Sequence, residues 1–138
     1  MTAPFAFPVR VYWEDTDAGG VVYYANYFKF MERARTEWLR SLGIEQVPLR
    51  DEHKVLFVIR DAESHYHKPA RYGDLLHVSC RLTRRTHATF SFAQEIVRVS
   101  DSQLLVTGSV RCACVDADTF KPRALPDVLV GQLVDQTT

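Results

Sequence analysis

Three acidic residues and a glycine pair lie close together near the start of the chain, just before a run of aromatic residues. Glu14, Asp15 and Asp17 precede Gly19 and Gly20 in the stretch E-D-T-D-A-G-G-V-V-Y-Y-A-N-Y. Glycine lets a ligand approach the backbone closely, and a helix start offers unpaired N–H groups and the positive end of the helix dipole. A carboxylate beside such a seat for negative charge can promote attack on a carbonyl carbon while the N–H groups stabilise the oxyanion. The stretch is therefore the first candidate for an active site.

An arbitrary aspartate in a loop is more often a solvated turn residue than a catalytic one. Here the acids are crowded together and surrounded by tyrosines and a tryptophan. Crowded carboxylates beside apolar groups are typical of sites that use a general base. A calcium loop is the other reading of the acids. Counted from Asp15, its twelfth position falls on Asn26 instead of the bidentate Glu that calcium requires. Calcium is therefore excluded.

Histidines and cysteines elsewhere give weaker signals. His65 and His67 are two residues apart and could begin a zinc site, but no obvious set of further ligands lies near them. Cys80, Cys112 and Cys114 are odd in number, and the last two share the apolar face of a predicted strand. We expect buried free thiols, which are typical of a reducing compartment, and hence a cytoplasmic protein. The sequence has neither a Gly-x-Ser-x-Gly nucleophile turn nor a Gly-rich phosphate loop ending in Lys and Ser/Thr.

The composition predicts a single globular domain over residues 1–138. Lys plus Arg and Asp plus Glu both number 17, so the balanced charge gives no reason to expect nucleic acid or a membrane surface as a partner. Residues 1–10 lack the apolar run of a secretory signal. No apolar run approaches the ~20 residues that span a bilayer, so membrane insertion is not expected.

A long amphipathic helix must position the acidic stretch. We predict that Asn26 caps this helix and that Gly43 ends it. Its apolar residues repeat at the spacing of one buried face, and they are Tyr27, Met31, Ala34, Trp38 and Leu42, widened by Phe28, Phe30 and Leu39. Strands are predicted at Phe7–Trp13, Val55 to about His67, Leu76–Leu82, Phe90–Ile96 (interrupted by Gln94) and Leu104–Cys114, with a polar connection at 45–54 and last helical turns at Val128–Val134.

This order of one strand, one long helix and four strands predicts an α+β fold with a five-stranded antiparallel sheet and one principal helix. A single helix covers only part of such a sheet. The uncovered surface and the edge strands then need a partner, so we expect self-association.

The motifs E-D-T-D-A-G-G-V-V-Y-Y-A-N-Y, F-M-E-R-A-R-T-E-W-L, H-K-P-A-R-Y-G-D and K-P-R-A-L-P resemble those of the hot-dog-fold thioesterases of the 4-hydroxybenzoyl-CoA type. The resemblance covers nearly the whole chain and is strongest to the YbgC-like acyl-CoA thioesterases associated with the Tol–Pal envelope system. It implies a five-stranded antiparallel sheet wrapped around one long helix, which agrees with the pattern of strands and helix above.

The resemblance also implies hydrolysis of an acyl-CoA to free acid and coenzyme A, without a metal or redox cofactor. The aromatic residues around the site suit a short aliphatic or an aromatic acyl group. Asp17 matches the family's catalytic carboxylate, as general base or as nucleophile, and Tyr24 the position of a backbone N–H that polarises the thioester carbonyl. The family forms dimers, or tetramers that are dimers of dimers, with the active site at the dimer interface. Further candidates are Tyr12, Trp13, Val22 and Tyr23 for the acyl pocket and Arg84, Arg85, Lys121 and Arg123 for the CoA phosphates, because Arg pairs with two phosphate oxygens at once.

Two alternatives come from other functional classes. Hot-dog hydratases carry a His five residues after the Asp, and Val22 occupies that position here, so hydration is disfavoured. A non-catalytic protein that binds an acyl carrier protein or envelope-biogenesis proteins remains open, because a fold does not fix a function.

Overall fold

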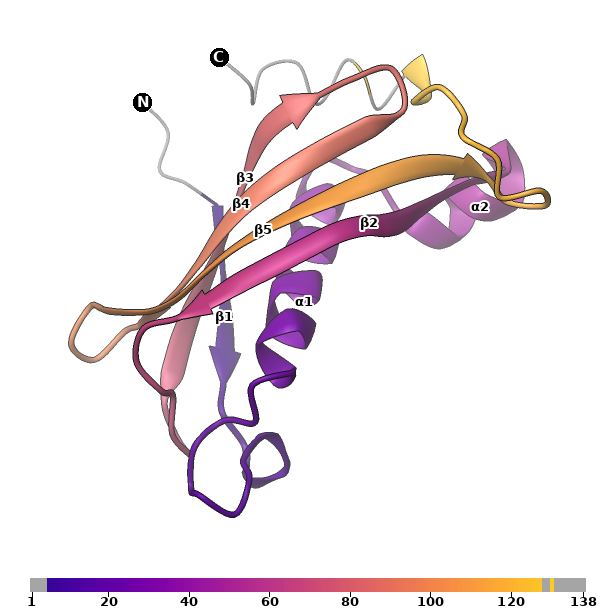
Figure 1. The fold of residues 1–138 in the computed structure, drawn as a ribbon. Coiled ribbons are helices and arrows are strands. Elements are labelled where there is room, and N and C mark those ends of the chain that lie inside the picture. The colour runs from indigo at the N-terminus through magenta and orange to yellow at the C-terminus, as the bar shows by residue number, and fades with distance from the viewer. Residues whose placement is uncertain (1–4, 128–129, 131–138) are drawn as a thin grey trace. The chain divides into compact units, whose positions relative to one another are not determined.

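A computed structural model describes residues 5–127 and 130 of the chain, and it confirms the predicted α+β class (Figure 1). The elements in chain order are β1 (Phe5–Arg10), the 3₁₀ helix η1 (Trp13–Asp15), α1 (Asn26–Ser41), α2 (Gln46–His53), β2 (Val55–Tyr66), β3 (Leu75–Arg85), β4 (Thr89–Arg98) and β5 (Gln103–Asp116). The strands form one five-stranded antiparallel sheet in the order β1-β3-β4-β5-β2. The last helical turns predicted at Val128–Val134 lie, apart from residue 130, outside the described residues.

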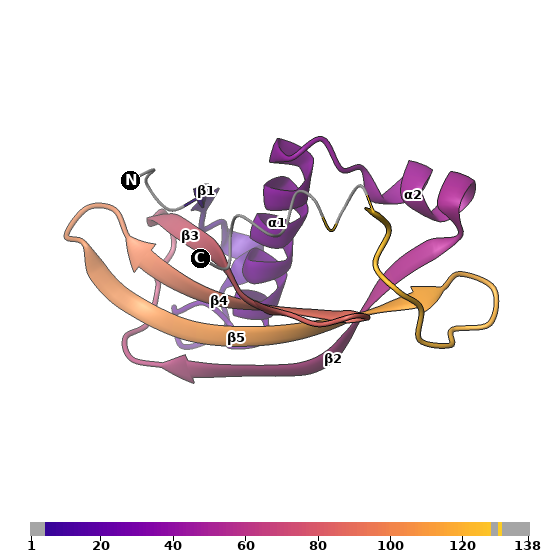
Figure 2. The same ribbon diagram turned by 90° about the horizontal axis from the view of Figure 1, so that it is seen from above.

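The chain divides into two compact units, of which the first comprises residues 1–38, 64–80 and 94–108. In this unit the predicted apolar face of α1 is buried, and the helix lies against one face of the strands (Figure 2). Phe30, Met31 and Ala34 are fully buried, together with Leu76 and Val78 of β3. Burial of this face, at roughly 25 cal/mol per Å² of apolar surface, is the main source of the helix's stability.

The boundaries of α1 follow from local hydrogen bonds. Asn26 is the first helical residue and not the predicted cap that precedes the helix. Its side-chain Nδ2 donates to the carbonyl of Asp15 (2.9 Å). Gly43 ends the helix as predicted, with a left-handed φ of 83° that glycine adopts without strain. The N–H of Ile44 then returns to the carbonyl of Leu39 (3.0 Å), which satisfies one carbonyl of the last turn.

The second unit comprises residues 39–63, 81–93 and 109–138. One prediction about this unit is wrong. The segment 45–54 was predicted as a polar connection, but it contains the helix α2. The sequence gives no clear signal for this helix, because Leu49 is its one buried residue and because Lys54, not a glycine, takes the left-handed C-cap position at φ 58°. Cys112 and Cys114 are buried free thiols as predicted.

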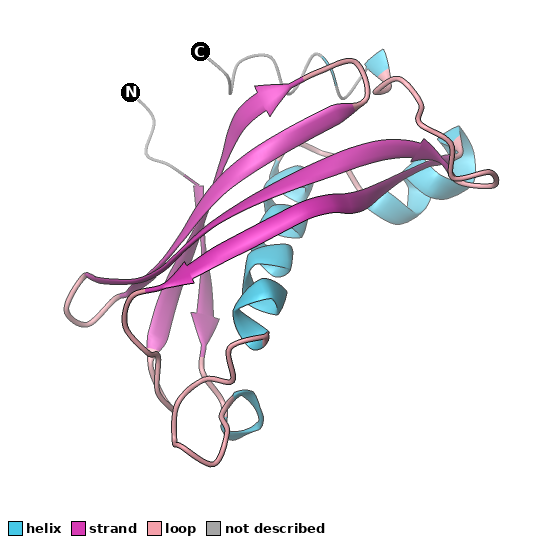
Figure 3. Ribbon diagram, viewed as in Figure 1, coloured by secondary structure: helices cyan, strands magenta, loops and turns pink. Residues whose placement is uncertain are grey.

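Three strand predictions also need correction. β1 ends at Arg10 and not at Trp13, because Trp13 begins the 3₁₀ helix, which Figure 3 shows as a separate short turn. β3 runs to Arg85, beyond the predicted end at Leu82, so Arg84 and Arg85 lie on this strand. In β5, Leu105 is fully buried while Leu104 is only half-buried. The carbonyl of Leu105 accepts two successive N–H groups, from residues 67 and 68, which disturbs the alternation as a β-bulge does.

Gln94 interrupts the apolar face of β4, as the sequence indicated, and the structure shows why it is tolerated. It is the one buried polar side chain found in the described part of the chain, at 1% exposure. Its Nε2 donates to the carbonyls of Met31 (3.0 Å) and Ser79 (3.2 Å), and its Oε1 accepts from Arg35 (3.0 Å). Buried amides are stable only when hydrogen-bonded in this way, so Gln94 ties α1 to the sheet of the first unit.

Candidate active site

The acidic triplet has one structural member, Asp15, and two exposed acids, Glu14 and Asp17. Asp15 closes the 3₁₀ helix, since its Oδ2 accepts from the N–H of Tyr12 (2.8 Å). The carbonyl of Asp15 accepts from the N–H of Tyr23 (2.9 Å) and from the side chain of Asn26, so this residue anchors the start of α1. Glu14 is exposed. Asp15 therefore acts as a scaffold residue, which the sequence could not distinguish from its neighbours.

Asp17 lies on a tight turn that presents its carboxylate to solvent. Its Oδ1 accepts from the N–H of Gly19 (2.8 Å), and its carbonyl accepts from the N–H of Gly20 (3.0 Å). Its own N–H donates to the carbonyl of Val21 (2.9 Å). Gly20 has a φ of 79°, which explains the glycine there. Within residues 5–127 and 130, Oδ2 has no hydrogen-bond partner, so one oxygen is fixed while the other is available for chemistry.

The backbone between this turn and α1 carries free donors. The N–H of Tyr24 donates to no group in the described part of the chain, and the same holds for Ala25. The carbonyls of these two residues, in contrast, accept from Tyr27 (3.3 Å) and Phe28 (3.2 Å). Unpaired N–H groups at a helix start are suited to bind a developing oxyanion. The predicted role of Tyr24 is thus compatible with its geometry.

A hollow of about 310 Å³ lies beside the start of α1, within the first unit. It is lined by Val22, Tyr24, Tyr27, Tyr66, His67, Lys68 and Pro69. The ring of Tyr66 packs against Tyr27 (centroids 5.6 Å apart) and edge-on to Tyr24 (6.3 Å). The hollow thus combines an aromatic wall with a polar rim, which is the usual character of a small-molecule site.

The predicted acyl-pocket residues are only partly brought together. Val22 lines the hollow, whereas Tyr12, Trp13 and Tyr23 do not. Trp13 is 71% exposed and stacks on Tyr72 with centroids 4.0 Å apart. The four residues Tyr66, His67, Lys68 and Pro69 were not predicted as site residues. The motif H-K-P-A-R-Y-G-D, which contains three of them, was the available signal.

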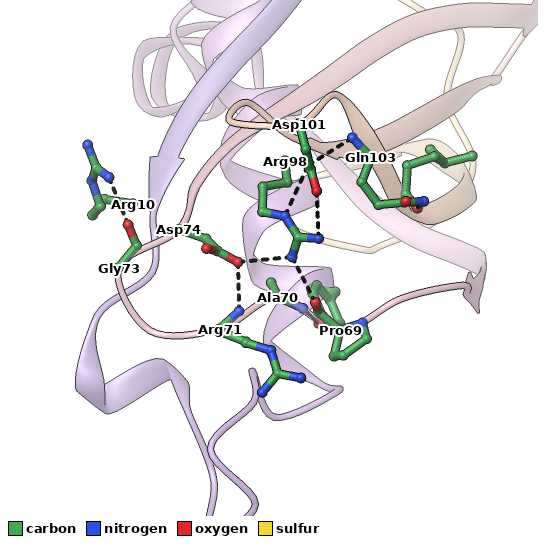
Figure 4. Close-up of polar contacts among 11 residues, drawn as sticks. Arg10, Pro69, Ala70, Arg71, Gly73, Asp74, Arg98, Asp101 and Gln103 are labelled. Carbon is green, nitrogen blue, oxygen red and sulfur yellow. Dashed lines mark hydrogen bonds and ion pairs between the residues drawn. The ribbon is translucent and has the colours of Figure 1, made fainter.

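A hydrogen-bond network holds the segment that forms one wall of the hollow (Figure 4). Arg98 binds both carboxylate oxygens of Asp101 (3.1 Å each) and reaches Asp74 and the carbonyl of Pro69 (3.4 Å each). The Arg98 hydrogen bonds are the main cause that lowers the pKa of Asp101. Asp74 also accepts from the N–H of Arg71 (2.9 Å). The wall is therefore braced from β4 and not left as a free loop.

The basic residues predicted for the CoA phosphates all belong to the second unit. Arg84 and Lys121 are exposed, and Arg85 is half-buried near the end of β3. Arg123 is exposed, but its Nη1 already donates to the carbonyls of His53 (2.8 Å) and Lys54 (2.9 Å). Their role toward phosphate remains a prediction, and Arg123 has a structural task as well.

Residues 5–127 and 130 contain neither a cluster of metal-ligating side chains nor a helix that could span a membrane. In that part of the chain, no three His, Cys, Asp or Glu side chains gather in a group that could hold a metal ion. Over the same residues, neither helix has the length and apolar character needed to cross a membrane.

Comparison with known proteins adds to this geometry. A model of the thioesterase-like superfamily matches residues 11–133. The chain is 45% identical to the acyl-CoA thioester hydrolase YbgC of Escherichia coli O6:H1 over 131 residues, covering 95% of this chain and 96% of that protein. It is also 45% identical to the acyl-CoA thioesterase YbgC of Haemophilus influenzae over 122 residues, covering 88% of each.

Solved structures agree with these matches. A probable thioesterase from Bartonella henselae is 38% identical with a TM-score of 0.84, covering 90% of this chain and 100% of that one. A 1,4-dihydroxy-2-naphthoyl-CoA thioesterase from Synechocystis has a TM-score of 0.90 over 99% of both chains, but at 24% identity this likeness concerns the fold alone. The chain belongs to the thioesterase-like superfamily with its hot-dog fold and, within it, to the YbgC family of acyl-CoA thioesterases.

Proposed function

We propose that this protein hydrolyses acyl-CoA thioesters, with Asp17 as the reacting carboxylate. The observation that carries the proposal is the turn at Asp17, which fixes one carboxylate oxygen on the N–H of Gly19 and leaves the other without a partner in the described part of the chain. The chain then leads directly to the unpaired N–H of Tyr24. A carboxylate and an oxyanion donor are the two groups that acyl transfer needs.

The reaction balances in either of two ways. As a general base, Asp17 takes a proton from water while the water oxygen attacks the thioester carbon. As a nucleophile, its oxygen attacks that carbon itself, and water later hydrolyses the resulting mixed anhydride. In both routes the carbonyl oxygen becomes an oxyanion that the Tyr24 N–H stabilises. The C–S bond then breaks, and the CoA thiolate leaves and takes up a proton.

The hollow supports a proposal for the substrate class. Its volume of about 310 Å³ and its tyrosine walls suit a short-chain or aromatic acyl group. We expect Val22 to contact that group, with Tyr12, Trp13 and Tyr23 on the approach to it. The CoA phosphates would bind to residues chosen from Arg84, Arg85, Lys121 and Arg123. An acyl carrier protein is the alternative thioester donor.

The site is proposed to work in a homo-oligomer, a dimer or a dimer of dimers. The support is that Asp17 and several large aromatic side chains are exposed in the single chain. The free cysteines fit a reducing compartment such as the cytoplasm.

The test is thiol release from a panel of acyl-CoAs, from short aliphatic through long-chain to aromatic. Asp17→Asn is expected to fold normally and to lose about 10²-fold or more in kcat, as for loss of a base or nucleophile. Glu14→Gln is the matched control, because Glu14 is an exposed acid of the same segment for which no catalytic role is proposed. Near-wild-type turnover by Asp17→Asn would refute the assignment. A wild-type protein inactive on every thioester would favour the non-catalytic binding protein.

A further inference from the structure

Tyr27 is a buried titratable residue in the hollow to which the mechanism above gives no task. It lies in the first turn of α1 and is only 3% exposed, whereas its neighbour Tyr24 is 60% exposed. Its ring is fixed edge-on to Phe30 (centroids 6.2 Å apart) and against Tyr66. A phenol held this firmly keeps its hydroxyl group at one defined position, in a residue that lines the hollow.

The hydroxyl of Tyr27 is used as an acceptor only. The N–H of Ala70 donates to it at 3.1 Å, and the carbonyl of Ala70 in turn accepts from the N–H of Val22 (2.9 Å). A phenolic oxygen has, besides its acceptor sites, one O–H proton to donate. Among residues 5–127 and 130 no group accepts that proton. A buried donor without a partner costs free energy unless a ligand or water satisfies it.

We propose that the Tyr27 hydroxyl donates a hydrogen bond to the thioester carbonyl oxygen of the bound substrate and serves, with the Tyr24 N–H, as a second donor to the oxyanion. The inference rests on the proposed function. Both groups belong to residues that line the same hollow. The Ala70 N–H holds the phenolic oxygen in place, so no reorganisation is needed when charge develops on the substrate.

The protonation state of Tyr27 agrees with this role. Burial is the largest cause that raises the pKa of the phenol above its usual range; the hydrogen bond from Ala70 opposes this shift, and Tyr66, Asp74 and Asp17 add to it. The hydroxyl therefore stays protonated at neutral pH and is present as a donor whenever the enzyme works.

Tyr27→Phe alone does not separate this role from a structural one, because it also removes the acceptor of the buried Ala70 N–H. The variant should lose about 10- to 100-fold in kcat with KM changed less than about twofold, as for a donor that acts in the transition state. Tyr72→Phe is the matched control, since it removes the hydroxyl of an exposed tyrosine that does not line the hollow.

The separating experiment replaces Tyr27 by 3,5-difluorotyrosine in the full-length chain. The fluorinated phenol keeps the ring and the oxygen that accepts from Ala70, but it ionises at a lower pH and then has no proton to donate. If the O–H acts in the transition state, the kcat–pH profile gains an alkaline limb that lies at least about one pH unit below that of the wild type. Thermal melting across the same pH range should show no matching loss of structure.

The outcomes separate this inference from the proposed function. Coincident kcat–pH profiles for tyrosine and difluorotyrosine, or a Tyr27→Phe effect confined to KM or to thermal stability, would overturn the role of Tyr27. The role of Asp17 would stand in that case, provided that Asp17→Asn is inactive. A wild-type protein without thioesterase activity would overturn both.

Discussion

The two glycines after Asp17 should respond in opposite ways to the same substitution. A Cβ at Gly19 would lie 3.2 Å from Oδ1 of Asp17, which is tighter than an ordinary contact. A Cβ at Gly20 would meet nothing within 4 Å, but the backbone there has a φ of 79°. Gly19→Ala therefore perturbs the carboxylate, whereas Gly20→Ala perturbs the backbone.

The sizes of the two effects follow from these numbers. To restore a normal contact, the Asp17 carboxylate must move by a few tenths of an ångström. Since a misplacement of about 1 Å can cost ~10²-fold in rate, Gly19→Ala should lower kcat roughly 3- to 10-fold. The free energy of unfolding of Gly19→Ala should change by less than about 1 kcal/mol. Alanine lowers the conformational entropy of the unfolded chain, and this gain offsets the strain of the tight contact. Gly20→Ala should cost about 1–2 kcal/mol of stability through its left-handed φ and change kcat less than about twofold.

Thiol release from the best acyl-CoA gives kcat, and urea denaturation gives the free energy of unfolding for both variants. The reasoning depends on the crossed pattern, with activity lost at one position and stability at the other. Full activity in Gly19→Ala would show that the position of the Asp17 carboxylate does not limit the rate. Equal losses of activity in both variants would show that any change in the turn disturbs the carboxylate, and would refute the separate roles of Gly19 and Gly20.

Two further predictions concern packing and assembly. Gln94→Met keeps the side-chain volume but removes the hydrogen bonds to Met31, Ser79 and Arg35. Urea denaturation should show a free energy of unfolding about 2–4 kcal/mol lower than that of the wild type. A change below about 0.5 kcal/mol would contradict the bridging role. Light scattering at micromolar concentration should show a dimer or larger assembly, and specific activity should fall on dilution; a stable and fully active monomer would refute the proposed oligomer.

The long helix was predictable because its stability comes from one apolar face, and the apolar residues of that face recur in the sequence at every third or fourth position. Met31, Ala34 and Trp38 are all buried, and Gly43 ends the helix with the positive φ that its residue type suggests. The helix α2 was not predictable, since tertiary packing of Leu49 and a non-glycine C-cap stabilise it without a recurring apolar pattern. The register of β5 at Leu105 also depends on hydrogen bonds from distant residues, which no local pattern records.

The candidate site shows a similar division. The local order of Asp17, Gly19 and Gly20 marked this stretch as a candidate site, and the structure has a turn there that presents the Asp17 carboxylate to solvent. The different tasks of Asp15 and Asp17 could not be read from two identical residue types in one loop. Their difference depends on which backbone N–H groups lie within reach of each carboxylate. The sequence placed Tyr27 on the buried face of the helix, and it gave no sign that this residue also lines the hollow and that its hydroxyl accepts from the N–H of Ala70.

Water access links the site to the proposed assembly. Oxyanion donors and a carboxylate are worth far more where water is excluded, because the local dielectric constant is then low. In the single chain Asp17 is exposed, and Tyr24 is 60% exposed at the edge of the hollow. The ring of Tyr27, in contrast, is held by its neighbours, and this residue is only 3% exposed. One side of the proposed site is therefore preorganised by α1, and we expect the bound acyl-CoA or a second copy of the chain to cover the other side. The exposed aromatic side chains of Tyr12, Trp13 and Tyr23 offer the apolar surface that such a cover would bury.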